Sequence, residues 1–467
     1  MAGGQPSDRR PEASRRTGTL FRWHAAAVHT SALVRHTESV SEAQRWWPGR
    51  RLGLGLLLAV VSASCGSTTP GSTGHVHGPG NGAHQSSPTS TDLPLALPAP
   101  AKTSVGDRGA VTSTTVNERP GARGPGSPTT NPGPPTCPQL TTAQLVGQRL
   151  IFSFTGTAAP SDLVRRIELG QAAGVILFSS NFTSTAELRQ LTGMLQALPR
   201  PAALHAPLLI MTDQEGGEVT RIPEPLLRSA SDTATGQDAL QLGEQAGATL
   251  AGGGVNMDLA PVLDVARPGS FLAAQQRTYG SSAEAVGRLG ESFAAGLART
   301  GVIATPKHFP GLGSAVVSTD YAPVHLGLSR TTLAHVDEAP FAAAISAGAP
   351  GLMLATAVYP ALDPALPAAL SPAVATTELR GRLGFQGVSI SDDLDAPALS
   401  AYGGPGQRAL LATLAGTDLL LFASSYSSGA QAEDYLIPLA GMGRIPNAGL
   451  CASAGRILTL RSQITVP

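Results

Sequence analysis

The sequence has few charged residues, and their signs balance. Charged side chains make up 14% of the 467 residues, with 32 Lys and Arg against 32 Asp and Glu, whereas roughly 25% is usual. A nucleic-acid-binding protein would carry a basic face and a polybasic membrane-surface protein an excess of cations, so the balance argues against both classes. Only three cysteines are present, too few for a disulfide scaffold or a cysteine-rich metal protein.

The chain also lacks any apolar run as long as the roughly 18–20 residues of a membrane-spanning helix. A shorter apolar run at 52–61 follows Arg50 and Arg51 and precedes the small residues 62–64 and Cys65. This order of charge, apolar run and small residues predicts a secretory signal within residues 1–65. Ordinary cleavage and a buried core helix are the alternatives.

Cys65 directly follows the small residues, which resembles a bacterial lipobox. That resemblance implies cleavage before Cys65 and lipidation of its thiol. We therefore expect an exported protein that is lipid-anchored to the outer face of the bacterial plasma membrane. Ser62 departs from the Leu that is commoner in lipoboxes. The long stretch before Arg50 indicates a start site further downstream, such as Val40.

Residues 66–136 are rich in Pro, Gly, Ser and Thr and have almost no aromatic residues. Such a segment cannot bury enough apolar surface to offset its chain entropy. We expect it to be a disordered, flexible tether that links the membrane anchor to a single domain at 137–467. Three histidines within it are interpreted as solvated spacer residues rather than metal ligands: His75, His77 and His84.

From residue 137 on, short apolar runs alternate with amphipathic stretches. The eight apolar runs are 150–154, 174–178, 207–212, 255–260, 302–306, 351–355, 387–391 and 418–422. The expected helices between them include 183–198, 237–251, 283–300, 333–347 and 406–415. Continuous apolar strands separated by helices indicate an α/β fold with a parallel sheet covered on both faces. Eight such units predict a (β/α)₈ TIM-type barrel; an open doubly wound sheet is the alternative, although it lacks its glycine-rich marker.

Polar residues cluster where four of these strands end. Asp213 follows the third strand, Asp264 the fourth, Lys307 and His308 the fifth, and Asp392 the seventh. Barrel enzymes carry their chemistry on the loops after the carboxyl ends of the strands. Four such clusters at one structural level predict an active site at the mouth of the barrel.

Several segments together resemble the catalytic barrel of glycoside hydrolase family 3, and within it the β-N-acetylhexosaminidase branch. They occur in the family's order, at 211–221, 258–265, 277–280, 307–311 and 391–394. The likeness covers about 140–465 and lacks the second sandwich domain of the family's β-glucosidases. It implies an exo-acting retaining glycosidase that releases terminal β-linked N-acetylglucosamine, or a related hexose, from cell-wall glycans. A β-glucosidase is an alternative.

The resemblance assigns Asp392 as the carboxylate nucleophile that a retaining glycosidase needs at the anomeric carbon. Because it directly follows a buried strand, its carboxylate can be held rigidly. The alternative is a helix N-cap after the strand. We interpret Asp393 as structural.

The same resemblance implies that five side chains bind the terminal sugar: Asp213, Arg221, Arg277, Lys307 and His308. The alternatives are a buried ion pair for the Lys–His pair and salt bridges to loop carboxylates for the two arginines. Glu215 precedes two glycines and is interpreted as structural, and Asp264 as a brace behind the site.

The loop after residue 311 departs from the family pattern. Ser318 and Asp320 stand where the branch has an Asp and the His that serves as general acid and base. We assign the acid/base role to Asp320, provided that an apolar loop against Tyr321 raises its pKa. His325 would reach the site only in a different loop register. A second departure is Thr356, where family members often have His.

The missing histidine leaves a second class of function open: a sugar-binding lipoprotein that has lost efficient hydrolysis. We expect a carbohydrate partner, no nucleic acid, no metal site or other cofactor, and a monomer. Cys137 and Cys451 lie near the two ends of the barrel sequence, where the first and last strands pair. In an oxidising compartment they are predicted to form a disulfide.

Overall fold

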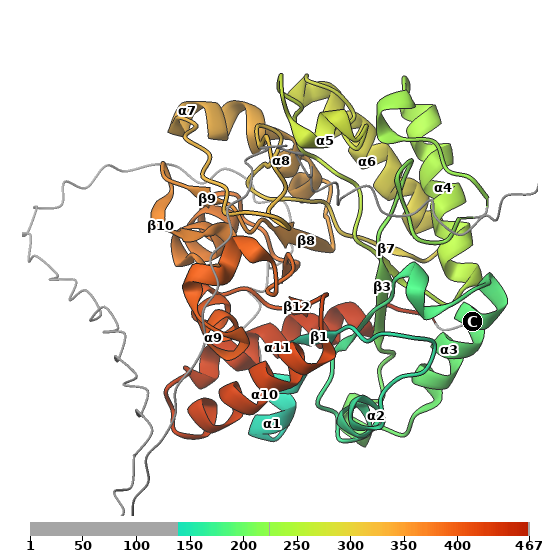
Figure 1. Cartoon of the computed structure of the whole chain (residues 1–467), viewed down its shortest axis with the longest axis vertical. Helices are drawn as coiled ribbons and strands as arrows, with labels where there is room; N and C mark the ends of the chain where they lie inside the picture. The colour runs from blue at the N-terminus through green and yellow to red at the C-terminus, as the bar shows by residue number, and fades with distance from the viewer. Residues whose placement is uncertain (1–138, 224, 466–467) are drawn as a thin grey trace, which may run out of the picture. The chain divides into compact units, whose positions relative to one another are not determined.

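A computed structural model describes residues 139–223 and 225–465. The predicted signal, the lipidation site Cys65, the linker and Cys137 lie outside these residues. The described fold is α/β, with a mostly parallel set of strands (Figure 1). Eight strands fall within the eight apolar runs, which confirms their prediction: β1 (Leu150–Phe152), β2 (Gly174–Ile176), β3 (Leu209–Thr212), β6 (Met257–Asp258), β7 (Ile303–Ala304), β8 (Gly351–Leu354), β11 (Val388–Ser391) and β12 (Leu420–Phe422).

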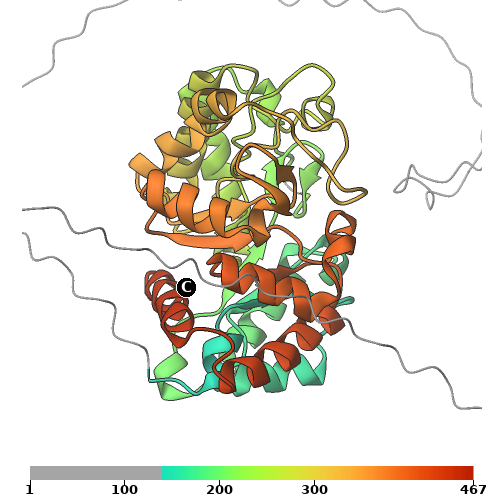
Figure 2. The same ribbon diagram turned by 90° about the vertical axis from the view of Figure 1, so that its left-hand side faces the viewer.

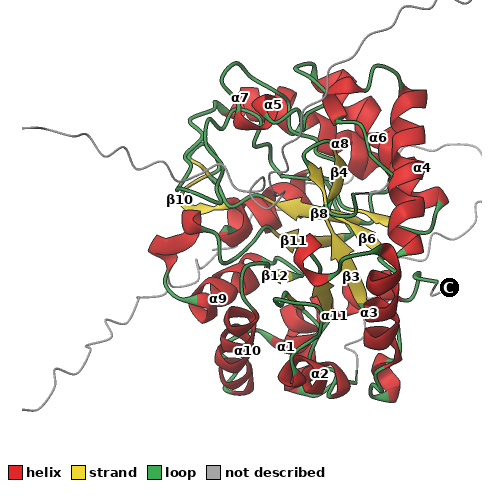
Figure 3. Cartoon of the chain, turned by 45° about the vertical axis from the view of Figure 1, so that its right-hand side comes forward, coloured by secondary structure: helices red, strands yellow, loops and turns green. Residues whose placement is uncertain are grey.

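These strands pair in parallel. Six of them form one sheet in the order β12-β1-β2-β3-β6-β7, and β8 pairs with β11. Single parallel bridges join Phe309, after β7, to Leu354 of β8, and Ile390 of β11 to Leu419, just before β12. The strands lie in the middle of the molecule with helices packed around them (Figure 3).

Both faces of the strands are buried. Along β1, Leu150 and Phe152 belong to the large apolar core shared with the helices, whereas Ile151 belongs to a second, smaller core. The smaller core includes Met211, Met257 and Met353 from three other strands. Since successive strand residues point to opposite faces, a strand buried on both faces needs a continuous apolar run. That requirement explains why the apolar runs located the strands.

The helices cover the outer face. They are α1 (Thr142–Gly147), α2 (Ser161–Glu168), α3 (Thr185–Ala197), α4 (Gly236–Gly252), α5 (Phe271–Ala274), α6 (Ala283–Arg299), α7 (Arg330–Thr332), α8 (Ala339–Ser346), α9 (Pro405–Ala415), α10 (Tyr426–Gly441) and α11 (Asn447–Arg461). Side-chain caps begin several of them; Thr235, for example, accepts a hydrogen bond from the backbone of Asp238 at the start of α4. The expected helix 333–347 differs, because a π-helical turn at Leu333–Asp337 precedes α8.

Two antiparallel pairs were not predicted. One is β4 (Gln214–Gly216) with β5 (Val219–Thr220), and the other is β9 (Val358–Tyr359) with β10 (Asp363–Pro367). Gly216 has a φ of 95°, which favours glycine, and a Cβ there would lie 2.1 Å from the Arg228 carbonyl oxygen. The adjacent glycines of the DQEGG segment were therefore a usable signal for the first turn.

The beginning and end of the described chain lie together. Helix α1 packs against α10 and α11, as the teal and red segments show in Figure 2. Cys451 lies on α11 and is 6% exposed. Its predicted partner Cys137 is outside the described residues, so the disulfide stays a prediction. None of the helices described here combines the length and apolar character needed to cross a bilayer.

Candidate active site

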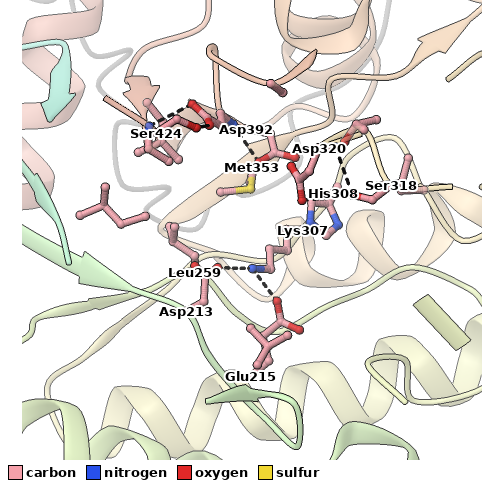
Figure 4. A pocket seen from close by; sticks show the side chains of 18 of the residues that line it. Asp213, Glu215, Leu259, Lys307, His308, Ser318, Asp320, Met353, Asp392 and Ser424 are labelled. Carbon is pink, nitrogen blue, oxygen red and sulfur yellow. Dashed lines mark hydrogen bonds and ion pairs between the residues drawn. The ribbon is translucent and has the colours of Figure 1, made fainter. Parts of the chain in front are cut away.

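A polar cavity of about 410 Å³ opens at the carboxyl ends of the strands. Its wall includes Ile176 of β2, Met353 of β8 and Leu421 of β12. It also includes every residue to which the sequence assigned a catalytic or sugar-binding role: Asp213, Arg221, Arg277, Lys307, His308, Asp320 and Asp392. Figure 4 shows Asp392, Asp320 and His308 grouped on one side and Lys307 reaching between Asp213 and Glu215.

Asp392 is held at the end of β11 by its own backbone. Its N–H donates to the Leu354 carbonyl at 2.9 Å, and its Oδ1 accepts the N–H of Asp393 at 2.8 Å. No helix begins there, since the next helical turn starts at Pro397, so the N-cap alternative is wrong. Burial raises the pKa of Asp392 to about 6; His308 opposes this rise, and the charge of Asp320 adds to it.

Asp393 makes different contacts from those of Asp392. Its Oδ1 accepts the backbone N–H groups of Asp395 and Ala423, both at 2.9 Å, and its Oδ2 accepts the hydroxyl of Ser424 at 2.6 Å. These bonds join the segment after β11 to the segment after β12. The contacts agree with a structural role for this second aspartate.

Lys307 is the centre of an ion cluster on the opposite side. The side chain is 3% exposed, and its Nζ lies 2.6 Å from Asp213 Oδ1 and 2.7 Å from Glu215 Oε1. Burial alone would lower the lysine pKa, but the two carboxylates outweigh it and raise the pKa. Lys307 therefore stays charged in the cavity wall, where its ion pairs match the ion-pair alternative.

Glu215 and the two arginines extend this cluster. Arg277 binds Glu215 through two bonds of 2.7 and 2.9 Å, and Arg221 lies 3.9 Å from Asp213 Oδ2. Burial would raise the pKa of Glu215, yet Arg277 and Lys307 lower it to about 2. The interpretation of Glu215 as a turn residue is therefore incomplete, because its side chain lines the cavity.

Asp264 stands behind His308 rather than at the cavity surface. Its Oδ2 lies 2.7 Å from His308 Nδ1, and its Oδ1 accepts the N–H of Leu312 at 2.5 Å. One carboxylate thus orients the imidazole and fixes the start of the next loop. This geometry agrees with the brace interpretation.

The loop at 312–321 brings Asp320 to the cavity, but without the expected apolar cover. Asp320 is exposed, and Tyr321 is 77% exposed, so Tyr321 does not shield it. That premise of the sequence prediction is wrong. Ser318 Oγ instead donates to Asp320 Oδ2 at 3.1 Å. His325 and Thr356 do not line the cavity; His325 forms a bridge with Val358.

Sequence reasoning missed the role of Asp258 under the cavity. It is fully buried on β6; its Oδ1 accepts the N–H of Gln214 at 2.9 Å, while its Oδ2 has no partner. Burial raises its pKa to about 8. The Gln214 side chain in turn accepts the N–H groups of Arg221 and Ile222. The hairpin that carries the cavity residues Glu215 and Val219 is thus tied to strand β6.

Fold and site together define a class. An α/β fold presents a partly enclosed carboxylate, a second exposed carboxylate, three cationic side chains and a histidine around one cavity. Two carboxylates of different environment are the groups that a glycoside-cleaving hydrolase uses, and the cations and Asp213 can hold sugar hydroxyls.

Comparison with known proteins extends this from class to family. Residues 142–460 match the Glycosyl hydrolase family 3 N terminal domain. A secreted, uncharacterized glycosyl hydrolase of Arthroderma benhamiae is 37% identical over 329 residues, which is 68% of this chain and 93% of that one. A beta-hexosaminidase of Alkalilimnicola ehrlichii is 36% identical over 283 residues, 58% of this chain and 79% of the relative.

Solved structures are similar to this chain as well. The family 3 beta-N-acetylglucosaminidase of Paenibacillus sp. str. FPU-7 is 35% identical with a TM-score of 0.66; the match covers 69% of this chain and 62% of that one. The beta-N-acetylhexosaminidase of Beutenbergia cavernae is 31% identical with a TM-score of 0.65, covering 69% of this chain and 99% of its own.

The chain belongs to glycosyl hydrolase family 3. It is a glycosidase that hydrolyses O-glycosyl bonds. Membership favours an enzyme over the sugar-binding protein that the missing histidine had left open.

Proposed function

We propose that this protein is an exo-acting, retaining glycosidase that releases terminal β-linked N-acetylglucosamine. The carrying observation is the partly enclosed carboxylate of Asp392, which shares one cavity with the exposed carboxylate of Asp320 and the Lys307 cluster. The relatives described as beta-hexosaminidases support this substrate over a β-glucoside.

In the proposed first step, which takes place without an apolar cover over Asp320, Asp392 attacks C1 of the terminal sugar while the protonated form of Asp320 gives its proton to the leaving oxygen. The glycosidic bond breaks, and a covalent glycosyl-enzyme forms with the alcohol as the first product. In the second step, Asp320 takes a proton from water, the resulting oxygen attacks C1, and Asp392 leaves as carboxylate. Both aspartates return to their starting states, as a retaining mechanism requires.

The polar cluster opposite Asp392 fixes the ring. The Asp213 carboxylate can accept hydrogen bonds from two sugar hydroxyls, while Lys307 and Arg221 can donate to hydroxyl oxygens. Arg221 is also braced from below, since its guanidinium lies 5.8 Å from the centre of the Phe178 ring. A ring held in this way places C1 within reach of the nucleophile. The bond-forming step then no longer carries the full entropic cost of bringing the two groups together.

We also infer that the eight parallel strands form one closed (β/α)₈ barrel. Two observations support closure: the bridge from Phe309 to Leu354 continues the pairing from β7 to β8, and the bridge from Ile390 to Leu419 continues it from β11 to β12. An open sheet would leave two strand edges without a partner.

For location, we propose export with a lipid anchor on Cys65 and cell-wall glycans as the substrate. The secreted description of the Arthroderma benhamiae relative supports export. Fractionation of cells that produce the full chain should place it in the membrane fraction, and Cys65→Ser should release it. A Cys65→Ser chain that stays in the membrane fraction contradicts the lipid anchor.

The activity is tested with two aryl substrates, a β-N-acetylglucosaminide and a β-glucoside. We expect hydrolysis of the first, with little of the second, and labelling of Asp392 by a fluorinated N-acetylglucosaminyl fluoride. Faster hydrolysis of the glucoside would make the protein a β-glucosidase. A label on another residue would remove Asp392 from the nucleophile role.

Asp320 is tested separately. On a β-linked N-acetylglucosamine disaccharide, Asp320→Ala should lose roughly 10²–10⁴-fold in rate, the usual contribution of a general acid. On the glycosyl fluoride, whose leaving group needs no proton, the variant should keep most of its activity in the first step. Equal losses on both substrates would show that Asp320 is not the acid.

A further inference from the structure

The acid loop (residues 312–321, which include Asp320) packs against a segment at 263–270 that forms no helix or strand. The backbone N–H of Arg267 in this segment donates to a carbonyl of the acid loop at 3.2 Å. Directly after the segment, the N–H of Phe271 donates to another at 3.0 Å. Because neither a helix nor a strand ladder holds the segment, its position depends on the separate contacts of its residues. The position of the acid loop depends on the segment in turn.

The side chain of Arg267 joins this segment to a buried carboxylate. Its Nη2 lies 2.8 Å from Oδ1 and 2.6 Å from Oδ2 of Asp337. The Asp337 side chain is fully buried, and the Arg267 side chain is 25% exposed. Breaking an ion pair at a buried carboxylate leaves a charge without compensation, so such a pair fixes its partners more firmly than a surface pair does.

Asp337 also packs against the start of the acid loop. It ends the π-helical turn at Leu333–Asp337, a rare kind of turn that often occurs at functional sites. A Cβ at Gly311 would lie only 2.7 Å from the Cβ of Asp337, so the loop begins directly on this residue. Asp337 therefore holds the acid loop in two ways, by packing against Gly311 and through the segment that Arg267 carries.

Neither member of the ion pair reaches the cavity. Leu312, Ser318 and Asp320 of the acid loop line it, whereas Arg267 and Asp337 do not. Ser318 binds the Asp320 carboxylate, as the dashed line in Figure 4 shows. A general acid must lie within hydrogen-bond reach of the oxygen that it protonates. The ion pair can therefore affect the reaction only through the place of the loop that carries the acid.

We propose that Arg267 and Asp337 are positioning residues for the reaction. Their ion pair holds the acid loop where Asp320 reaches the glycosidic oxygen. The proposal rests on the proposed function, in which Asp320 is the acid, and it assigns a role in catalysis to two residues outside the cavity. It predicts that the ion pair matters for substrates that need an acid and not for those that do not.

The test compares kcat/KM on a β-linked N-acetylglucosamine disaccharide and on N-acetylglucosaminyl fluoride, whose leaving group needs no proton. Arg267→Met removes the cation, and Asp337→Asn removes the negative charge. Each should lower the value for the disaccharide by roughly 10- to 100-fold, the cost of misplacing a catalytic group by about 1 Å, and leave the fluoride unchanged. The double variant should lose no more than the more damaging single variant, because both changes remove one interaction.

An Asp320→Ala background shows whether the ion pair acts through the acid. Without a carboxyl group at this position there is no acid to place, so Arg267→Met should cause no further loss on the disaccharide. A residue that only stabilises the fold would lower activity in both backgrounds and on both substrates. A further loss in the Asp320→Ala background, or equal losses on the two substrates, overturns the proposal.

Arg299→Met is the matched control. Arg299 also pairs with a carboxylate, that of Glu244 at 2.6 Å, but this pair is exposed and lies outside the cavity wall. Both substrates should keep their wild-type values in this variant. Wild-type values in Arg267→Met and Asp337→Asn as well would contradict the positioning role.

Asp320→Ala by itself separates this proposal from the proposed function. Equal losses on both substrates in that variant contradict the acid role and the positioning role with it. A loss confined to the disaccharide, without a similar loss in Arg267→Met, contradicts the positioning role alone. If the wild-type enzyme prefers glucosides, only the substrate assignment fails, and the same comparison is made with a β-linked glucose disaccharide and glucosyl fluoride.

Discussion

The charge state of Asp392 depends on its surroundings. Burial raises its pKa to about 6, and the nearby charge of Asp320 contributes to that rise. A nucleophile must be ionised, so on the glycosyl fluoride, which needs no general acid, activity rises as the pH rises through this value and falls below it. We therefore expect an acidic limb near pH 6 in the pH profile of kcat/KM.

The effect of Asp320 on that limb is testable with the glycosyl fluoride, which does not need a general acid. Asp320→Asn removes a like charge, so the pKa of Asp392 should fall and the limb should move to lower pH. Asp434→Asn, at an exposed position on α10 outside the cavity wall, should leave the limb in place. An unchanged limb in Asp320→Asn would show that the two carboxylates do not interact.

At the scale of elements, the loop that carries Asp320 depends on Gly313. A Cβ at this position would lie 2.0 Å from the Val265 carbonyl oxygen, so Gly313→Ala must displace the loop. We expect a loss of up to about 10²-fold in kcat on the disaccharide, the effect of misplacing a catalytic group by about 1 Å. Gly327→Ala is the control, because a Cβ there meets nothing within 4 Å. Equal rates in the two variants would contradict the prediction.

Asp418 joins three elements below the strands. Its carboxylate binds Arg380, Arg456 and the hydroxyl of Ser453 on α11, and it accepts the backbone N–H of Ser389 on β11 at 3.0 Å. Burial would raise its pKa, but the two arginines outweigh burial and lower it. The stabilisation is therefore present at neutral pH and lost as the pH falls below the usual range of an aspartate.

Asp418→Asn should lower the free energy of unfolding by up to roughly 3–5 kcal/mol, because it removes the charge of a fully buried carboxylate from two half-buried arginines. Glu244→Gln removes an exposed ion pair with Arg299 and should cost less than about 1 kcal/mol. Urea unfolding at pH 7 measures both. A cost for Asp418→Asn as small as that of the surface pair would show that the network contributes little.

At the scale of the whole molecule, a disulfide between Cys137 and Cys451 would tie the entry of the domain to its last helix. Its loss in Cys137→Ser should lower the free energy of unfolding by roughly 2–5 kcal/mol. Peptide mapping without reduction should recover the two cysteine peptides as one species. A Cys137 peptide joined to Cys65, or to no other peptide, contradicts the pairing.

The sequence by itself located the eight strands and the residues at their ends. Strands buried on both faces must be continuously apolar, so runs such as 351–355 are visible without any tertiary information. Because parallel strands end at one edge, we expected Asp213, Lys307 and Asp392 to lie together at the carboxyl ends of the strands. The motif segments then attached a chemical role to each of them.

Tertiary structure decided which charges meet. Asp264 orients His308, Glu215 binds Arg277, and Asp258 is buried with one oxygen unpaired. Each of these depends on contacts between residues far apart in the chain. Hydrophobic periodicity indicates which face of a strand is buried, but it does not indicate which polar side chains pair on that face. The exposure of Tyr321 was missed for the same reason. The local sequence indicated that Tyr321 would cover Asp320, but in the folded loop the tyrosine side chain points outward.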